Sequence, residues 1–132
     1  MIFTNSDGGS RGNPGEAAIG ILVRDDNQIL RKYSSKIGEA TNNIAEYKAL
    51  IKALEIASEF TKEEIICILD SELIVKQLLG EYRVKNDVLL ELFLKVQKLQ
   101  ENFKSIKYKH VSRYNKYQKI VDGLLNRELD RK

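Results

Sequence analysis

The chain begins with the stretch Met1-Ile2-Phe3-Thr4-Asn5-Ser6-Asp7-Gly8-Gly9-Ser10-Arg11-Gly12-Asn13-Pro14-Gly15. Its apolar start predicts a short strand over residues 2–6 that Asp7 closes, and its glycines predict a turn-rich loop over residues 8–15. A carboxylate at a strand tip, beside glycines that let a ligand or another backbone come close, is a candidate site residue. An Asp in an ordinary turn has the same local sequence, so the function of Asp7 depends on partners elsewhere in the chain.

The composition is typical of one globular domain. The 132 residues are 42% hydrophobic and 31% charged, with a net charge of +3, which suits a protein with a real core. No apolar run approaches the roughly 20 residues of a membrane span, and no secretory signal is present. The single cysteine, Cys67, lies in an apolar run and excludes an internal disulfide. We therefore expect a cytoplasmic protein with no membrane partner, and a monomer by default.

The order of the expected elements indicates a mixed α/β sheet. Strands are expected over residues 17–24, 28–36, 65–69 and 105–111, a loop over 38–43, and helices over 44–60, 71–79, 87–102 and 117–130. A turn cluster at residues 25–27 makes the first three strands an antiparallel meander. Helices separate the later strands, so those strands are expected to run parallel to the first. The predicted fold class is a five-stranded mixed sheet, three antiparallel strands and then two parallel ones, flanked by helices.

Two further carboxylates are candidate partners for Asp7. Glu46 projects from the apolar side of its helix, in line with small alanines that let the helix lie close to a sheet. Asp70 ends a buried strand, where sites form in open α/β sheets. Each has an ordinary alternative, because Glu46 suits a helix N-terminus and Asp70 or Ser71 suits a helix cap. If the three carboxylates converge, they require a divalent cation, and oxygen ligands favour Mg²⁺ or Mn²⁺.

Positive charge is concentrated in one segment near the C-terminus. It contains Lys104, Lys107, Lys109, Arg113, Lys116 and Lys119, interleaved with Tyr108, Tyr114 and Tyr117, and it has no Asp or Glu. Cations interleaved with aromatic rings suit a phosphate backbone. A solvated strand edge followed by a loop has the same composition. The segment alone does not separate these two interpretations.

Three blocks, in this order, resemble the ribonuclease H family of type 1 over nearly the full chain. They are Asp7-Gly8-Gly9-Ser10-Arg11-Gly12-Asn13-Pro14-Gly15, Thr41-Asn42-Asn43-Ile44-Ala45-Glu46-Tyr47 and Leu69-Asp70-Ser71-Glu72-Leu73-Ile74-Val75-Lys76-Gln77. The resemblance implies a ribonuclease H-like fold and a single catalytic domain over residues 1–132. The separate N-terminal hybrid-binding domain of some relatives is not expected, and the basic helix of others has no clear counterpart in residues 80–86.

The same resemblance implies hydrolysis of the RNA strand of an RNA–DNA hybrid, giving 5′-phosphate and 3′-hydroxyl ends. Two Mg²⁺ ions about 4 Å apart, for which Mn²⁺ substitutes, would bridge the scissile phosphate. Asp7 and Asp70 would contact the metal most directly, with Glu46 assisting. The residues expected to contact the hybrid are Gly8, Ser10, Asn13, Thr41, Asn42, Asn43, Ser71, Gln77, Arg113 and Lys116. The only histidine, His110, falls within the last expected strand and is assigned a structural role.

The fourth carboxylate of the family is less regular in this chain. The family has an Asp at the start of the final helix, a few residues after an Asn, and counting from Asn115 without a gap puts Lys119 there. A short insertion instead puts Asp122 there, beside an apolar stripe that includes Val121 and Leu125. We favour Asp122 as the fourth catalytic and metal-binding carboxylate, and a solvent-facing Asp that only favours the helix dipole is the alternative.

Two other functions are compatible with the fold. A non-catalytic hybrid-binding module is disfavoured by the complete set of Asp7, Glu46 and Asp70. Another nuclease on the same fold, such as a resolvase or integrase, is disfavoured because residues 12–15 and 41–43 resemble elements that read hybrids. Fold alone does not decide between these functions.

Overall fold

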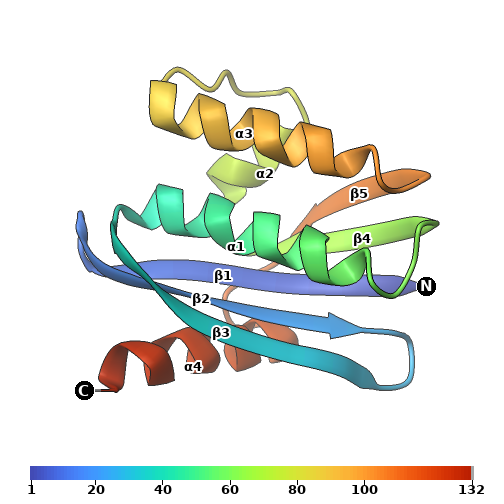
Figure 1. Ribbon diagram of the computed structural model, residues 1–132, viewed down its shortest axis with the longest axis horizontal. Coiled ribbons are helices and arrows are strands. Elements are labelled where there is room, and N and C mark those ends of the chain that lie inside the picture. Colours follow the sequence, from blue (N-terminus) through green and yellow to red (C-terminus); the bar gives the residue numbers. More distant parts are fainter. Residues whose placement is uncertain (132) are drawn as a thin grey trace.

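Five strands form one mixed sheet with helices on both faces (Figure 1). The computed structural model describes residues 1–131, and Lys132, the last residue of the expected domain, lies outside the described residues. The elements are β1 (Ile2–Gly12), β2 (Gly15–Arg24), β3 (Ile29–Ala40), α1 (Asn42–Ala57), β4 (Glu64–Leu69), α2 (Glu72–Leu78), α3 (Asp87–Gln100), β5 (Ser105–His110) and α4 (Lys116–Asp130). The strand order is β3-β2-β1-β4-β5, with the first three strands antiparallel and β4 and β5 parallel to β1. The predicted fold class is confirmed.

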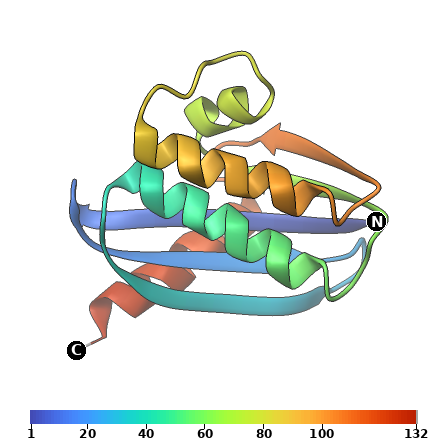
Figure 2. The ribbon, with the colours of Figure 1, turned by 45° about the horizontal axis from the view of Figure 1, so that its top comes forward.

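The helices are divided unequally between the two faces of the sheet. α1 packs on β1 and β2 with α3 beside it, whereas α4 covers β1, β2 and β3 from the opposite face (Figures 1 and 2). The largest core cluster includes Tyr47, Leu50 and Leu54 of α1 together with Ile65 and Leu69 of β4. Burial of each such side chain stabilises the fold by roughly 1.5–3 kcal/mol. The buried face of α1 therefore fixes the height at which its N-terminal end lies over β1.

β1 is longer than predicted. The expectation that Asp7 closes the first strand is wrong, because β2 pairs with β1 as far as Gly12, and Asp7 lies opposite Gly20 in mid-strand. The loop expected over residues 8–15 is reduced to Asn13 and Pro14. The parallel ladder between β1 and β4, however, ends at Asn5. Asp7 therefore projects just beyond the point where β4 stops, which leaves room for a site.

Other boundaries move by a few residues. The loop expected over residues 38–43 is wrong, because residues 38–40 pair with β2 and extend β3. Thr41 is the N-cap of α1, and its Oγ1 accepts a hydrogen bond from the backbone N–H of Ile44 at 3.2 Å. α1 therefore begins at Asn42, two residues earlier than expected, and ends at Ala57 rather than at residue 60. The remaining helices and strands are confirmed within about two residues at either end.

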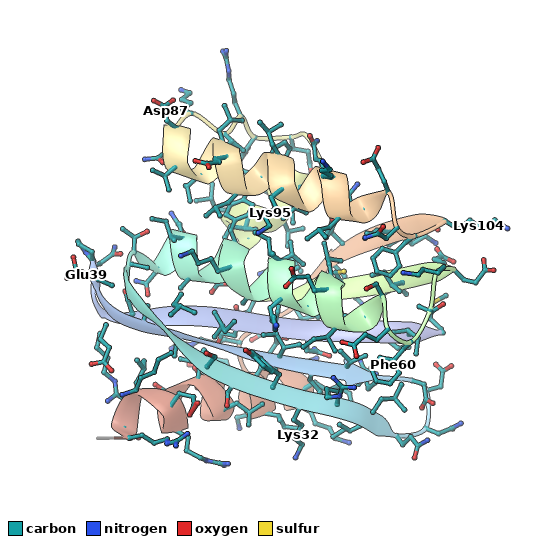
Figure 3. All side chains as sticks on the ribbon, viewed as in Figure 1. Lys32, Glu39, Phe60, Asp87, Lys95 and Lys104 are labelled. Atoms are coloured by element: carbon teal, nitrogen blue, oxygen red, sulfur yellow. The ribbon has the colours of Figure 1, made fainter. Side chains whose placement is uncertain are left out.

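α3 is held to the fold by one apolar stripe. Val96 is buried, and Leu92 and Phe93 pack against the main core. Asp87 and Lys95 of this helix face solvent (Figure 3). Over residues 1–131, no helix combines the length and the apolar character that crossing a membrane requires.

Candidate metal centre

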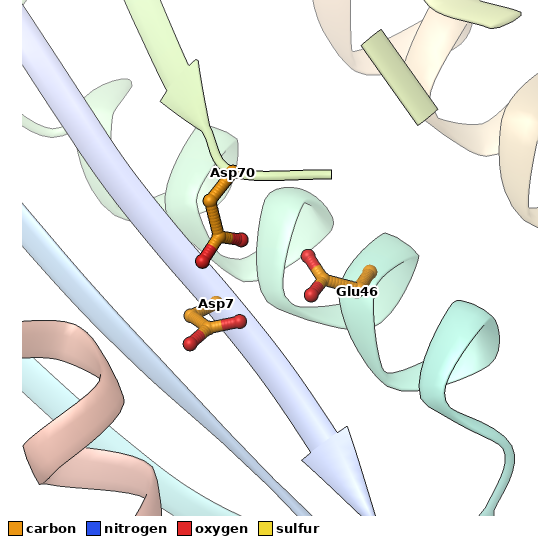
Figure 4. Close-up of side chains that lie close together, drawn as sticks. All are labelled: Asp7, Glu46 and Asp70. Atoms are coloured by element: carbon orange, nitrogen blue, oxygen red, sulfur yellow. The ribbon is translucent and has the colours of Figure 1, made fainter. Parts of the chain in front are cut away.

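Three carboxylates from three different elements meet where β4 ends (Figure 4). Asp7 comes from β1, Glu46 from the N-terminal part of α1, and Asp70 from the residue that follows β4. One carboxylate oxygen of each residue lies within 4.8 Å of the others. Asp122 of α4 lines the same pocket, which has a volume of about 470 Å³. The structure thus brings all four predicted carboxylates to one pocket, with the first three in direct proximity.

Two glycines let the helices approach Asp7 from opposite faces of the sheet. A Cβ atom at Gly8 would lie 2.2 Å from the backbone carbonyl carbon and oxygen of Ala45 in α1. A Cβ atom at Gly20 would lie 2.3 Å from the backbone oxygen of Val121 in α4. The backbone of Gly8 also lies near the carboxyl group of Glu46 and lowers its pKa, against the larger rise that burial causes. Gly8 therefore sets both the height of α1 and the position of Glu46 beside Asp7.

We expect Gly8→Ala to destabilise the fold by about 1–3 kcal/mol, the usual cost of overpacking, and to move Glu46 away from Asp7. The thermal midpoint and Mn²⁺ affinity should therefore both fall. Gly9→Ala is the matched control, because a Cβ there would meet only Leu125 Cδ1 at 3.5 Å and Asn42 Oδ1 at 4.0 Å. Equal losses in the two variants would mean that the close approach at Gly8 is unimportant.

Burial and mutual repulsion make these carboxyl groups hard to ionise. Loss of hydration, followed by the charge of Asp70, raises the pKa of Asp7 to about 7. Burial also raises the pKa of Glu46 well above its ordinary value, and the charge of Asp7 raises it further. The pKa of Asp70 is raised as well, mainly by burial. Without a cation, the cluster therefore retains protons that isolated carboxyls would have lost.

The residues present fit a divalent cation with oxygen ligands. The Oε2 atom of Glu46 is buried and has no hydrogen-bond partner within residues 1–131. Such a buried oxygen is costly unless a cation or a donor compensates for its lost hydration. Because all the converging ligand atoms are carboxylate oxygens, the donor set suits a hard cation such as Mg²⁺ or Mn²⁺ and not a site for a soft metal.

Without metal, the protein should become less stable as pH rises from about 4 to about 7. The pKa of Asp7 is 3.8 as an isolated group and about 7 in the fold. The folded state therefore binds more protons between these values, and the free energy of unfolding falls as pH rises through them. Thermal melts in chelator across this range check the sign. Asp7→Asn should make the melting temperature less dependent on pH. A melting temperature that rises with pH in the wild-type protein would contradict the prediction.

Several predicted substrate residues line a second pocket. It has a volume of about 430 Å³ and is lined by Asn13, Thr41, Asn42, Asn43, Ile44, Asn86, Val88 and Leu89. The backbone N–H of Asn42 donates to Asn13 Oδ1 at 2.9 Å, and the backbone N–H of Ser10 donates to Asn42 Oδ1 at 2.9 Å. These bonds tie the turn between β1 and β2 to the start of α1. Ser10, Asn13 and residues 41–43 are therefore brought together.

Other predicted substrate residues are distributed differently. Ser71 and Arg113 line the carboxylate pocket, and Ser71 also caps α2 through its Oγ. Lys116 is exposed, with its Nζ 5.2 Å from the centroid of the Tyr117 ring. Gly8 is buried beneath α1. Gln77 is only 6% exposed, and its Oε1 accepts a hydrogen bond from the Tyr47 hydroxyl at 2.6 Å, so its contact with substrate stays a prediction.

Four other residues lie at or near the site. His110 ends β5 as predicted, but it is exposed, and its positive charge, when present, lowers the pKa of Asp70. Lys119 lines the carboxylate pocket beside Asp122, and so does Tyr114. The alternation of tyrosines with cations was a signal for Tyr114. No local pattern indicated Gln118, which is fully buried in the first turn of α4.

The fold and the acidic edge define a class of α/β protein with a cluster of carboxylates at its strand ends. A family profile described as reverse transcriptase-like matches residues 5–118. The Bifunctional protein Rv2228c of Mycobacterium tuberculosis is 39% identical over 98% of this chain, and the chain spans 35% of that relative's length. The RNase H1 of Halobacterium salinarum superposes with a TM-score of 0.92 at 37% identity, covering 98% of this chain and 97% of that chain.

A third relative was solved with nucleic acid. LC11-RNase H1, in complex with an RNA/DNA hybrid, has a TM-score of 0.91 at 38% identity, covering 98% of this chain and 97% of that chain. The chain belongs to the ribonuclease H family, type 1.

Proposed function

We propose that this chain is an endonuclease that hydrolyses the RNA strand of RNA–DNA hybrids with two Mg²⁺ ions, for which Mn²⁺ substitutes. The observation that supports this most is the convergence of Asp7, Glu46 and Asp70 within 4.8 Å in a member of the ribonuclease H family. When bound, the ions would supply an activated water and stabilise the leaving 3′ oxygen. Because the three converging carboxylates and Asp122 all come from one chain, we propose that it acts as a monomer.

The carboxylates have different tasks in this proposal. Asp7 and Asp70 would hold the metal, and the buried Oε2 of Glu46 would complete the inner side of the site. Asp122 is exposed and closes the site from α4. Because metal ligands must be deprotonated, metal binding should release the protons that Asp7 and Glu46 retain. Ser71 and Arg113 line the same pocket, and we propose that they contact the substrate next to the scissile bond.

The second pocket suits the backbone of the DNA strand. Its polar lining consists of neutral side chains, among them Asn13, Thr41 and Asn86. α1 and α3 both begin there, and helix N-termini favour phosphate through their free N–H groups and dipoles. Contacts to phosphate and sugar position a duplex without reading its bases. We therefore propose little base-sequence preference.

A comparison of substrates tests the proposal. Labelled RNA–DNA hybrid, double-stranded RNA and branched DNA are each incubated with Mg²⁺ and with chelator. The proposal expects cleavage of the RNA strand of the hybrid, only with metal. Hybrid binding without cleavage would support the binding-module alternative, and preferential cleavage of branched DNA would support a resolvase-like nuclease.

Hybrid affinity should depend on the basic segment. The measurement uses an Asp70→Asn background, which is expected to prevent turnover. Changing Arg113 and Lys116 to Glu should weaken hybrid binding, and it should reduce by about 2 the steepness with which the logarithm of the association constant falls with the logarithm of the salt concentration. Changing Lys48 and Lys52 on the outer side of α1 is the control and should leave the slope unchanged. Fluorescence anisotropy over a salt series measures both. Equal effects from the two pairs would show that the basic segment is only a solvated edge.

A further inference from the structure

One polar side chain is fully buried directly behind the carboxylates. Gln118, in the first turn of α4, is 0% exposed. Burying an amide is costly unless its hydrogen bonds are made inside the protein. Its neighbours in the turn are solvent-accessible, since Lys119 is exposed and Tyr117 is half-buried. The fold therefore buries this amide beneath α4, although the residues on either side of it in the helix reach solvent.

Every polar group of the Gln118 amide has a partner. Its Oε1 accepts a hydrogen bond from Asn5 Nδ2 at 3.0 Å, and its Nε2 donates to the backbone oxygen of Ser6 at 3.2 Å. Its amide also lies close enough to the carboxyl group of Asp70 to lower the pKa of that group. The amide oxygen and the amide nitrogen thus each have a hydrogen-bond partner inside the protein. The side chain thus bridges β1, at the residue before Asp7, and the end of β4.

The bridge is anchored at its far end. Asn5 Oδ1 accepts a hydrogen bond from Arg24 Nε at 3.2 Å. The Arg24 guanidinium lies 4.5 Å from the centroid of the Phe3 ring and 3.8 Å from that of Tyr117, which are stabilising cation–π contacts. These contacts therefore connect Arg24 of β2, through Asn5 of β1, to Gln118 of α4. They hold the Gln118 side chain in place beside Asp70.

We propose that Gln118 is a positioning residue of the metal centre, which sets the separation of Asp7 and Asp70 and the placement of α4. The inference rests on the proposed function of these carboxylates as metal ligands. Gln118 and Asp122 are four residues apart and therefore share one helix face, so anchoring the amide also fixes where Asp122 enters the pocket. The extra residues between Asn115 and Asp122 supply the helical turn that carries Gln118.

Glutamine is the side chain with the required reach and groups. Glutamate would lose both donors and add charge beside Asp70, and methionine would keep the length without hydrogen bonds. Asparagine would keep the amide but is one methylene too short to span Asn5, Ser6 and Asp70. Partners that orient metal ligands usually change metal affinity or activity by 10–100-fold when they are removed.

The test compares Gln118→Met with Gln77→Met. Gln77 is also a buried helical glutamine with one side-chain partner, the Tyr47 hydroxyl, and it does not line the carboxylate pocket. Calorimetry with Mn²⁺ alone, and with Mg²⁺ alone, measures metal affinity without substrate. We expect about tenfold weaker binding in Gln118→Met and unchanged binding in Gln77→Met. The Mg²⁺ concentration for half-maximal hybrid cleavage should rise by the same factor, with kcat recovering as Mg²⁺ saturates.

Gln118→Asn provides a milder variant if Gln118→Met does not fold, and it should weaken metal binding in the same direction. A folded Gln118 variant with wild-type metal affinity would overturn the inference, whatever its thermal midpoint. The two proposals fail separately. If the wild-type protein binds Mn²⁺ and the variant binds it more weakly, but neither cleaves hybrid, the positioning role stands and the proposed substrate does not. If the wild-type protein cleaves hybrid and the Gln118 variant binds metal with wild-type affinity, only the positioning role fails.

Discussion

Asp7→Asn and Asp70→Asn are each expected to reduce hybrid cleavage by at least about 1,000-fold. A metal ion contributes several kcal/mol to stabilising the charge that develops in such a reaction, and each 1.36 kcal/mol corresponds to tenfold in rate. Both residues belong to the cluster whose oxygens lie within 4.8 Å of one another. Hybrid binding should be largely retained, because it depends on phosphate contacts elsewhere. Single-turnover cleavage and anisotropy measure the two properties separately.

The same variants distinguish a functional cluster from a structural one. In chelator, Asn at either position should leave the thermal midpoint unchanged or raise it by a few degrees, since about 1 kcal/mol of relieved repulsion has roughly that effect in a domain of this size. The raised pKa values of Asp7 and Asp70 have the sign that this expectation requires. A large loss of stability in both variants would show that the carboxylates act as structural caps.

Asp122→Asn is expected to lower turnover by about 100-fold under Mg²⁺, with partial recovery under Mn²⁺. Asp122 lines the carboxylate pocket, and its charge raises the pKa of both Asp7 and Asp70. A softer ion that tolerates fewer carboxylates should compensate in part for the lost ligand. Steady-state rates over a series of each metal, with hybrid at saturation, measure the effect.

Lys119→Ala is the control for that experiment. Lys119 lines the same pocket three residues earlier on α4, but its charge is opposite to that of a metal ligand. We expect its removal to change turnover by no more than a few-fold. Wild-type rates in Asp122→Asn under Mg²⁺ would mean that the site works with three carboxylates, and that the insertion before Asp122 has no catalytic meaning.

The position of the carboxylates could be predicted because each lies beside a strong local pattern. Asp70 follows an apolar strand, and Glu46 lies in line with alanines on a helix face that is buried at Ala45, Ala49 and Ala53. These periodicities report burial directly. Asp122 was predicted from the resemblance to the family with a short insertion, and the apolar stripe next to it supported that alignment; Val121 and Leu125 of the stripe are indeed buried.

The length of β1 could not be predicted from local sequence. Gly8, Gly9 and Gly12 are turn signals by themselves, yet the ladder with β2 keeps them extended, which is a tertiary effect. The absence of a side chain at Gly8 serves the approach of α1 and not a turn. This requirement becomes visible only when the helix is in place over the strand.

The two buried glutamines show the same limit for side chains. Gln77 lies within a block that resembles the family's substrate-contacting region, and it is buried against Tyr47. Gln118 lies in a segment of lysines and tyrosines that resembles a solvated surface, and it is the least exposed side chain there. Neither environment follows from spacing, because it depends on which elements pack above the residue.

The chemistry of the cleaved ends tests the central claim most directly. The wild-type protein is incubated with end-labelled RNA–DNA hybrid and Mg²⁺, and the RNA fragments are analysed by mass spectrometry. The convergence of the carboxylates of Asp7, Glu46 and Asp70 predicts attack by water and therefore fragments with 5′-phosphate and 3′-hydroxyl ends. Fragments with 2′,3′-cyclic phosphate ends would contradict the account, because they require attack by the 2′-hydroxyl of the RNA.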